Sequence, residues 1–82
     1  MSTQTFRVRS AEDLGRVLRE ARLNHGLTQA EAVEQLGATY DRTRLARMEA
    51  GEGLQSFSRM IHALRRLGVE VTATMTVSET QS

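Results

Sequence analysis

The segment 42–47 places three arginines within six residues, Arg42, Arg44 and Arg47, with Thr43 among them. A guanidinium group is a planar fork of donors that binds phosphate, or the O6 and N7 atoms of guanine, through two parallel hydrogen bonds. The alternative is a merely solvated charged face. Because acidic residues flank this cluster without interrupting it, we predict that it binds nucleic acid.

The apolar residues of the same region indicate a helix that presents these arginines to a ligand. A helix turns by about 100° per residue, so Leu45 and Met48, three positions apart, are expected to share its buried side. The helix is expected to begin near Thr39 or Asp41 and to end at about Ala50. The candidate base contacts on its outward side are Arg47, Thr43, Arg42 and Tyr40, and Arg44 is a candidate phosphate contact.

Capping signals predict two helices before this one. Ser10 begins the first, which ends at Gly26, and Thr28 begins the second, which ends at Gly37. Thr28 and Glu31 have the spacing of a capping box, in which each residue bonds the backbone N–H of the other. The N–H groups of such a first turn also suit phosphate, which makes Thr28 a candidate phosphate contact.

A fourth helix and two strands complete the predicted elements. Apolar residues recur at helical spacing from Phe57 to Leu67, and Gly68 ends the pattern. The period then changes to two over residues 69–77, which indicates a strand, and residues 5–9 show a shorter alternation. The apolar residues of the longer strand are Val69, Val71, Ala73, Met75 and Val77.

The strand at 69–77 is expected to pair with a second copy of the chain. A lone strand can neither satisfy its backbone groups nor bury its apolar side. Pairing within one chain to residues 5–9 is the alternative, but that segment is shorter. A chain of 82 residues without cysteine also lacks disulfides, and its small core gains from a partner subunit.

The composition argues against several other classes of protein. Cysteine is absent, and His25 and His62 lie far apart, so neither a metal site nor another cofactor is expected. No paired carboxylates or phosphate-binding glycine loop indicates an enzyme. No apolar run approaches the roughly 20 residues of a membrane span, and the N-terminus lacks a signal peptide, so a cytoplasmic location is expected.

The run from Arg22 to Glu31, followed by Leu36-Gly37 and the segment 45–51, resembles the Xre-type (phage repressor/Cro-like) helix-turn-helix family. The resemblance covers about residues 14–68 and centres on Gly26-Leu27-Thr28-Gln29. It implies a compact four-helix, lambda-repressor-like domain whose third helix enters the major groove of double-stranded DNA.

The resemblance also implies roles for individual residues. Gln29 matches a glutamine that contacts phosphate, and Arg22 and Glu49 match a buried ion pair between the first and third helices. The interval from Gly37 to Glu49 is two residues longer than is usual in the family. The position of Tyr40 therefore depends on the helix start, whereas Arg47 keeps its place because it is counted back from Glu49.

The order of elements, with a closing strand after Gly68, further resembles HipB-type antitoxins. This implies a mostly α-helical fold with terminal strands in an intersubunit sheet, and a homodimer that represses its own operon at a palindromic operator and binds a HipA-like kinase. Open alternatives are a stand-alone regulator, an antitoxin for another toxin class, and an adaptor that no longer binds DNA. The expected organisation is an N-terminal arm (1–9), a helix-turn-helix domain (10–68), a dimerisation strand (69–77) and a flexible tail (78–82).

Overall fold

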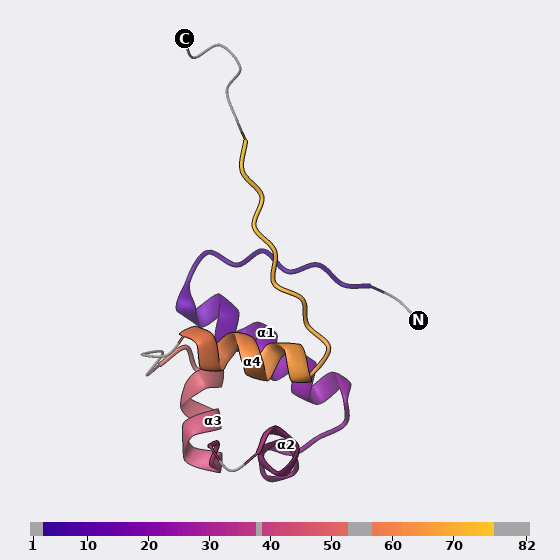
Figure 1. Cartoon of the computed structure of the whole chain (residues 1–82), viewed down its shortest axis with the longest axis vertical. Coiled ribbons are helices and arrows are strands. Elements are labelled where there is room, and N and C mark those ends of the chain that lie inside the picture. Colours follow the sequence, from indigo (N-terminus) through magenta and orange to yellow (C-terminus); the bar gives the residue numbers. More distant parts are fainter. Residues whose placement is uncertain (1–2, 38, 53–56, 77–82) are drawn as a thin grey trace.

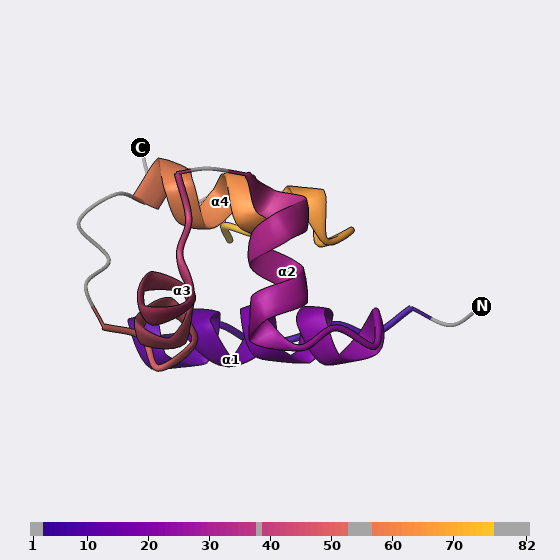
Figure 2. The same ribbon diagram turned by 90° about the horizontal axis from the view of Figure 1, so that it is seen from below.

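The structure is a computed structural model and describes residues 3–37, 39–52 and 57–76. In chain order the helices are α1 (Ala11–Asn24), α2 (Gln29–Leu36), α3 (Arg42–Glu49) and α4 (Phe57–Arg66). Figure 1 shows α2 and α3 on one side of α1 and α4, and the two terminal segments on the other side. In the view from below, α1 and α4 run along opposite edges and α2 spans the distance between them (Figure 2).

Side-chain caps determine where the first three helices begin. The Ser10 side chain accepts a hydrogen bond from the backbone of Asp13, and Thr28 forms a complete capping box with Glu31. Both predicted starts are therefore confirmed. Asp41 caps α3 by accepting from the Arg44 backbone N–H at 2.7 Å, which decides between the two possible starts of that helix. Each cap satisfies a donor that the helix itself leaves unpaired.

The core lies where the four helices meet. Its largest fully buried side chains are Leu18, Leu45, Met60 and Leu64, one from α1, one from α3 and two from α4. Phe57 belongs to the apolar pattern that predicted α4, but this residue is 61% exposed. Phe57 is the first residue of the helix, and the contact of α4 with the core begins one turn later at Met60.

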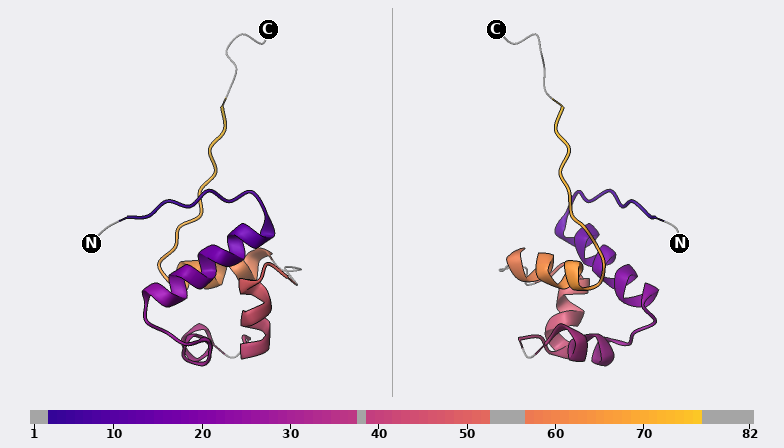
Figure 3. Two further views of the ribbon diagram at one scale, coloured as in Figure 1. Left: turned by 180° about the vertical axis from the view of Figure 1, so that it is seen from behind. Right: turned by 45° about the vertical axis from the view of Figure 1, so that its right-hand side comes forward.

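Two glycines allow the backbone of α1 to contact the end of α3. A Cβ atom at Gly15 would lie 2.5 Å from the carbonyl oxygen of Met48, and one at Gly51 would lie 2.6 Å from the Cα of Glu12. Gly51 also has a φ of +78°, a left-handed conformation that favours glycine. The left-hand view of Figure 3, from behind, shows α1 crossing above the end of α3. The two elements are therefore packed backbone to backbone.

The two terminal segments are extended but form no strand within the described chain. Residues 3–9 and 69–76 carry no strand, and the last backbone hydrogen bond runs from the N–H of Val69 to the carbonyl of Leu64. Over residues 5–9 and 69–76, the predicted strands are therefore not formed within one copy, because neither segment makes the ladder of backbone hydrogen bonds that a strand requires. Val77 and the tail 78–82 lie outside the described residues.

Replacing Gly15 with alanine tests the close approach of the two backbones. Alanine normally favours a helix over glycine by about 1 kcal/mol. Here the added Cβ must move the end of α3, and overpacking of this kind costs about 1–3 kcal/mol, so we expect a net loss in the free energy of unfolding. Urea denaturation measures it, with the exposed Arg19→Ala in the same helix as the control. A Gly15→Ala protein at least as stable as the wild type would contradict the packing.

Candidate nucleic-acid interface

The outward side of α3 carries the basic cluster. Leu45 and Met48 are buried, which leaves Arg42, Thr43 and Arg47 exposed on the opposite side of the helix. An open depression on this side joins α3 to the start of α2. Its lining residues are Gln29, Arg42, Thr43, Ala46, Arg47, Ala50 and Glu52. The structure thus brings together four of the residues that the sequence singled out for DNA contact.

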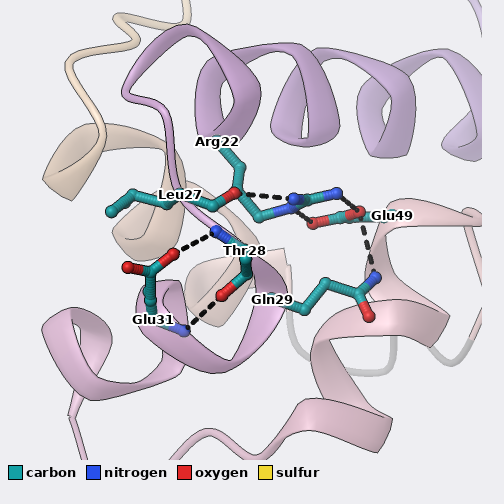
Figure 4. Close-up of polar contacts among 6 residues, drawn as sticks. All are labelled: Arg22, Leu27, Thr28, Gln29, Glu31 and Glu49. Carbon is teal, nitrogen blue, oxygen red and sulfur yellow. Dashed lines mark hydrogen bonds and ion pairs between the residues drawn. The ribbon is translucent and has the colours of Figure 1, made fainter.

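A buried ion pair holds α3 against α1 beneath this depression. The Nε of Arg22 donates to Oε2 of Glu49 at 2.7 Å, and Nη2 donates to Oε1 at 3.1 Å (Figure 4). The two side chains are 10% and 5% exposed. A third donor, Nη1, binds the carbonyl oxygen of Leu27 at 2.8 Å, in the turn that leads into α2. One guanidinium therefore connects α1, the turn and α3 through geometry that suits a bidentate pair.

Gln29 joins this network from the first position of α2. Its Nε2 donates to Oε1 of Glu49 at 3.3 Å, as Figure 4 shows. A carboxylate only accepts hydrogen bonds, so the amide must present its nitrogen rather than its oxygen. An amide nitrogen carries two hydrogens, and the second is free to donate to a phosphate oxygen. Glu49 consequently orients the group that was predicted to contact the DNA backbone.

Thr28 uses its side chain to cap α2. Its hydroxyl accepts from the N–H of Glu31 at 3.1 Å, and its own N–H donates to Oε1 of Glu31 at 2.9 Å. The backbone N–H of Thr28, which donates to the carboxylate, and secondly the Thr28 side chain lower the pKa of Glu31 from its ordinary value. The cap leaves the N–H groups of Gln29 and Ala30 without a partner among the described residues, so these can donate to a phosphate.

Arg44 braces the turn before α3. Its Nη1 donates to the carbonyl oxygen of Thr39 at 2.8 Å, while its backbone N–H is capped by Asp41. The side chain is exposed, but it is not part of the depression lined by Arg42 and Arg47. A phosphate contact by Arg44 stays a prediction, and the structure adds a local role in holding the turn.

The prediction that Tyr40 contacts DNA bases is wrong, because this residue lies in the core. Its side chain is 5% exposed, and its hydroxyl donates to the carbonyl oxygen of Arg59 at 2.9 Å. It also lies 3.0 Å from Nδ1 of His62, which therefore supplies the proton of that second hydrogen bond. Burial raises the pKa of Tyr40. Since α3 begins only after Asp41, the helical projection that placed Tyr40 outward does not apply to it.

The sequence-based prediction missed three residues of the depression: Ala46, Ala50 and Glu52. Ala46 could have been found, because it follows Thr43 at a spacing of three on the outward side of the helix. Glu52 lies beyond the end of α3 and has no periodicity to indicate its position. Its backbone N–H donates to the carbonyl oxygen of Arg47 at 2.8 Å, which keeps it close to the last turn.

The described parts of the chain contain neither a cluster of metal-binding side chains nor a helix that could span a membrane. Within residues 3–37, 39–52 and 57–76, no group of three or more histidine, cysteine, aspartate or glutamate side chains is placed to bind a metal ion. The helices of these segments are all too short or too polar to cross a membrane.

The sequence matches the model of a known family. The model of a family described as a helix-turn-helix domain matches residues 13–75, about three quarters of the chain. No curated protein matches the sequence. The matched region contains α2, α3 and α4, all of α1 except its first two residues, the buried ion pair and the depression.

Removing one partner of the buried ion pair tests its structural role. We expect Arg22→Ala to lower the free energy of unfolding by about 3–5 kcal/mol, because the carboxylate of Glu49 stays buried without its counter-charge. Replacing both residues with apolar ones, Arg22→Met with Glu49→Leu, is expected to cost less than Arg22→Ala alone.

Urea denaturation provides the measurement, and Arg16→Ala provides the control. Arg16 forms an exposed ion pair with Asp13 at 3.5 Å, so its loss is expected to change stability by less than about 0.5 kcal/mol. Equal effects of Arg16→Ala and Arg22→Ala would show that burial of the pair has no energetic consequence.

Proposed function

Because the chain belongs to the helix-turn-helix domain family, we propose that it is a sequence-specific regulator of transcription that reads double-stranded DNA with α3. The observation that carries this proposal is the depression lined by Gln29, Arg42, Thr43 and Arg47. It brings together a phosphate-binding group at the start of α2 and base-reading groups on α3. In helix-turn-helix proteins, phosphate contacts position the domain on the duplex and the second helix of the motif contacts the bases. No enzymatic activity is assigned to the chain.

The chemistry of each side chain gives it a role at the major groove. Arg47 binds O6 and N7 of a guanine through its guanidinium, and Arg42 and Thr43 contact neighbouring bases or phosphates. Gln29 donates to a phosphate from α2, which sets the depth and register of α3 in the groove. A net charge of only +1 is compatible with this, because the positive charge that meets the DNA is local.

Arg47→Ala tests the DNA-reading role directly. Duplexes selected by the wild-type protein from a random-sequence pool serve as the ligand. We expect the variant to lose about 1–3 kcal/mol of binding free energy and to lose preference at one base position, because one bidentate contact is removed. Fluorescence anisotropy at several salt concentrations measures both affinity and its dependence on salt.

Arg19→Ala is the matched control for that experiment. It removes the same charge from the exposed side of α1, outside the depression, and is expected to leave base preference unchanged. An Arg47→Ala protein that binds the selected duplexes as tightly as the wild type would rule out this assignment of α3.

We also propose that the functional unit is a homodimer joined through residues 69–77. Support comes from the described part of this segment beyond Val69, residues 70–76, which makes no backbone hydrogen bond to the described chain and in which Val71 and Met75 are 43% and 80% exposed. A groove of about 610 Å³ separates it from the N-terminal arm above α1, with Phe6, Val8 and Val71 among its lining residues. A second copy would supply the backbone ladder that one chain lacks and cover these apolar side chains.

The dimer would present two copies of α3 to a palindromic operator. Half-sites are then expected about one helical turn apart, at roughly 34 Å. The terminal segments and the pair α2 and α3 lie on opposite sides of the molecule in Figure 1, so pairing of two copies would leave the reading helices uncovered.

Neighbouring substitutions on the closing segment test the dimer without disturbing the core. Val71→Glu and Thr72→Glu add the same charge at adjacent exposed positions. We expect only Val71→Glu to yield a monomer, because a strand sends adjacent side chains to opposite faces and Val71 belongs to the apolar one. Light scattering coupled to gel filtration measures the mass, and a monomeric wild-type protein would refute the dimer.

The finer identity that we propose is an antitoxin that represses its own operon and binds a HipA-like kinase in the cytoplasm. Its support is the resemblance of the four helices and the closing segment after Gly68 to HipB-type antitoxins. A stand-alone regulator with the same DNA chemistry, or an antitoxin for another toxin class, is the alternative. Co-purification with the product of the neighbouring gene distinguishes them, because only an antitoxin retains such a partner.

A further inference from the structure

Glu52 is the acidic residue of the depression on which the proposed DNA contact is based. It lines this surface together with Gln29, Arg42 and Arg47, and it is exposed. The hydrogen bond from its backbone N–H to the carbonyl oxygen of Arg47, at 2.8 Å, fixes its backbone against the last turn of α3. Any DNA that contacts Arg47 is therefore brought close to Glu52.

The other acidic residues of this region have structural partners. Asp41 caps α3, Glu31 completes the capping box of α2, and Glu49 binds Arg22 and Gln29. Within the described chain, the carboxylate of Glu52 makes neither a hydrogen bond nor an ion pair, although Arg47 is near in sequence. The carboxylate of Glu52 therefore stabilises no contact within the described chain and can accept hydrogen bonds from a ligand.

The chemistry of a carboxylate narrows what it can bind on a DNA duplex. It only accepts hydrogen bonds, so phosphates repel it, as do the acceptor atoms of guanine and thymine in the major groove. The donors in this groove are the N4 amino group of cytosine and the N6 amino group of adenine. Adenine presents its N7 acceptor beside N6, whereas cytosine presents no acceptor of its own there. Cytosine is therefore the base that suits Glu52.

We propose that Glu52 is a specificity-determining residue that accepts a hydrogen bond from the N4 amino group of a cytosine in the major groove. This inference rests on the proposed function and assigns a further residue to the same surface. On a duplex with guanine or thymine at that position, the carboxylate loses water without gaining a donor, and with adenine it meets the N7 acceptor beside the N6 donor. Glu52 therefore selects sequences by weakening the binding of all others, which complements the attraction that the arginines supply.

Glu52→Gln tests the proposal because glutamine keeps the size of the side chain and removes its charge. Wild-type protein and variant each select duplexes from a random-sequence pool, and the selected sequences are read out. We expect the wild type to prefer cytosine at one position and the variant to lose this preference or exchange it for adenine, the base whose N6 and N7 suit an amide. Loss of a structural role alone would not change the preferred base.

Binding measurements give the size of the effect. The ratio of affinities for the selected duplex and an unselected duplex is expected to fall about 5- to 150-fold in Glu52→Gln, mainly because unselected DNA binds more tightly. Glu34→Gln changes the net charge equally at an exposed position of α2 that does not line the depression, and we expect it to keep the wild-type ratio.

Three results would overturn the proposal. One is an unchanged cytosine preference in Glu52→Gln, and a second is an equal loss of selectivity in Glu34→Gln, which would reduce the effect to net charge. In both cases the wild-type protein still selects DNA, so the proposed function survives. A wild-type protein that enriches no sequence would overturn the inference and the proposed function together.

Discussion

The buried ion pair between Arg22 and Glu49 is the interaction on which the helix-turn-helix geometry depends. The guanidinium comes from the end of α1, the carboxylate from the end of α3, and the same guanidinium also holds the Leu27 carbonyl before α2. A buried charge cannot lose its partner without a large cost in free energy. Since Glu49 also orients Gln29, the stability of the domain and the presentation of a phosphate-binding group depend on one carboxylate.

The ion pair in turn requires the close backbone contact between α1 and the end of α3. Gly15 and Gly51 leave no side-chain atoms between these elements, and this brings Glu49 within reach of Arg22. The same arrangement leaves the terminal segments on the side of α1 opposite to α2 and α3 (Figure 1). Under the proposed function, the two surfaces can therefore act at the same time, one on DNA and one on a second copy.

The charges around α3 show how a nearly neutral chain can present a basic surface. Asp41 and Glu31 serve as helix caps and Glu49 is neutralised by Arg22, so most nearby negative charge is used within the fold. Arg42 and Arg47 stay exposed beside them. Local pairing of the acidic residues, more than the sum of charges, decides the electrostatic character of this side of the molecule.

The sequence by itself determined the starts of the first two helices and the outward direction of Arg47, because capping and helical period are local properties of the chain. Only the tertiary structure decided the place of Tyr40, which precedes the cap of α3 and turns toward the backbone of Arg59. The close contact at Gly15 likewise depends on an element that is distant in sequence. The alternation at 69–77 defines two faces, but a strand needs a partner, and no pattern within one segment identifies the partner with which it pairs.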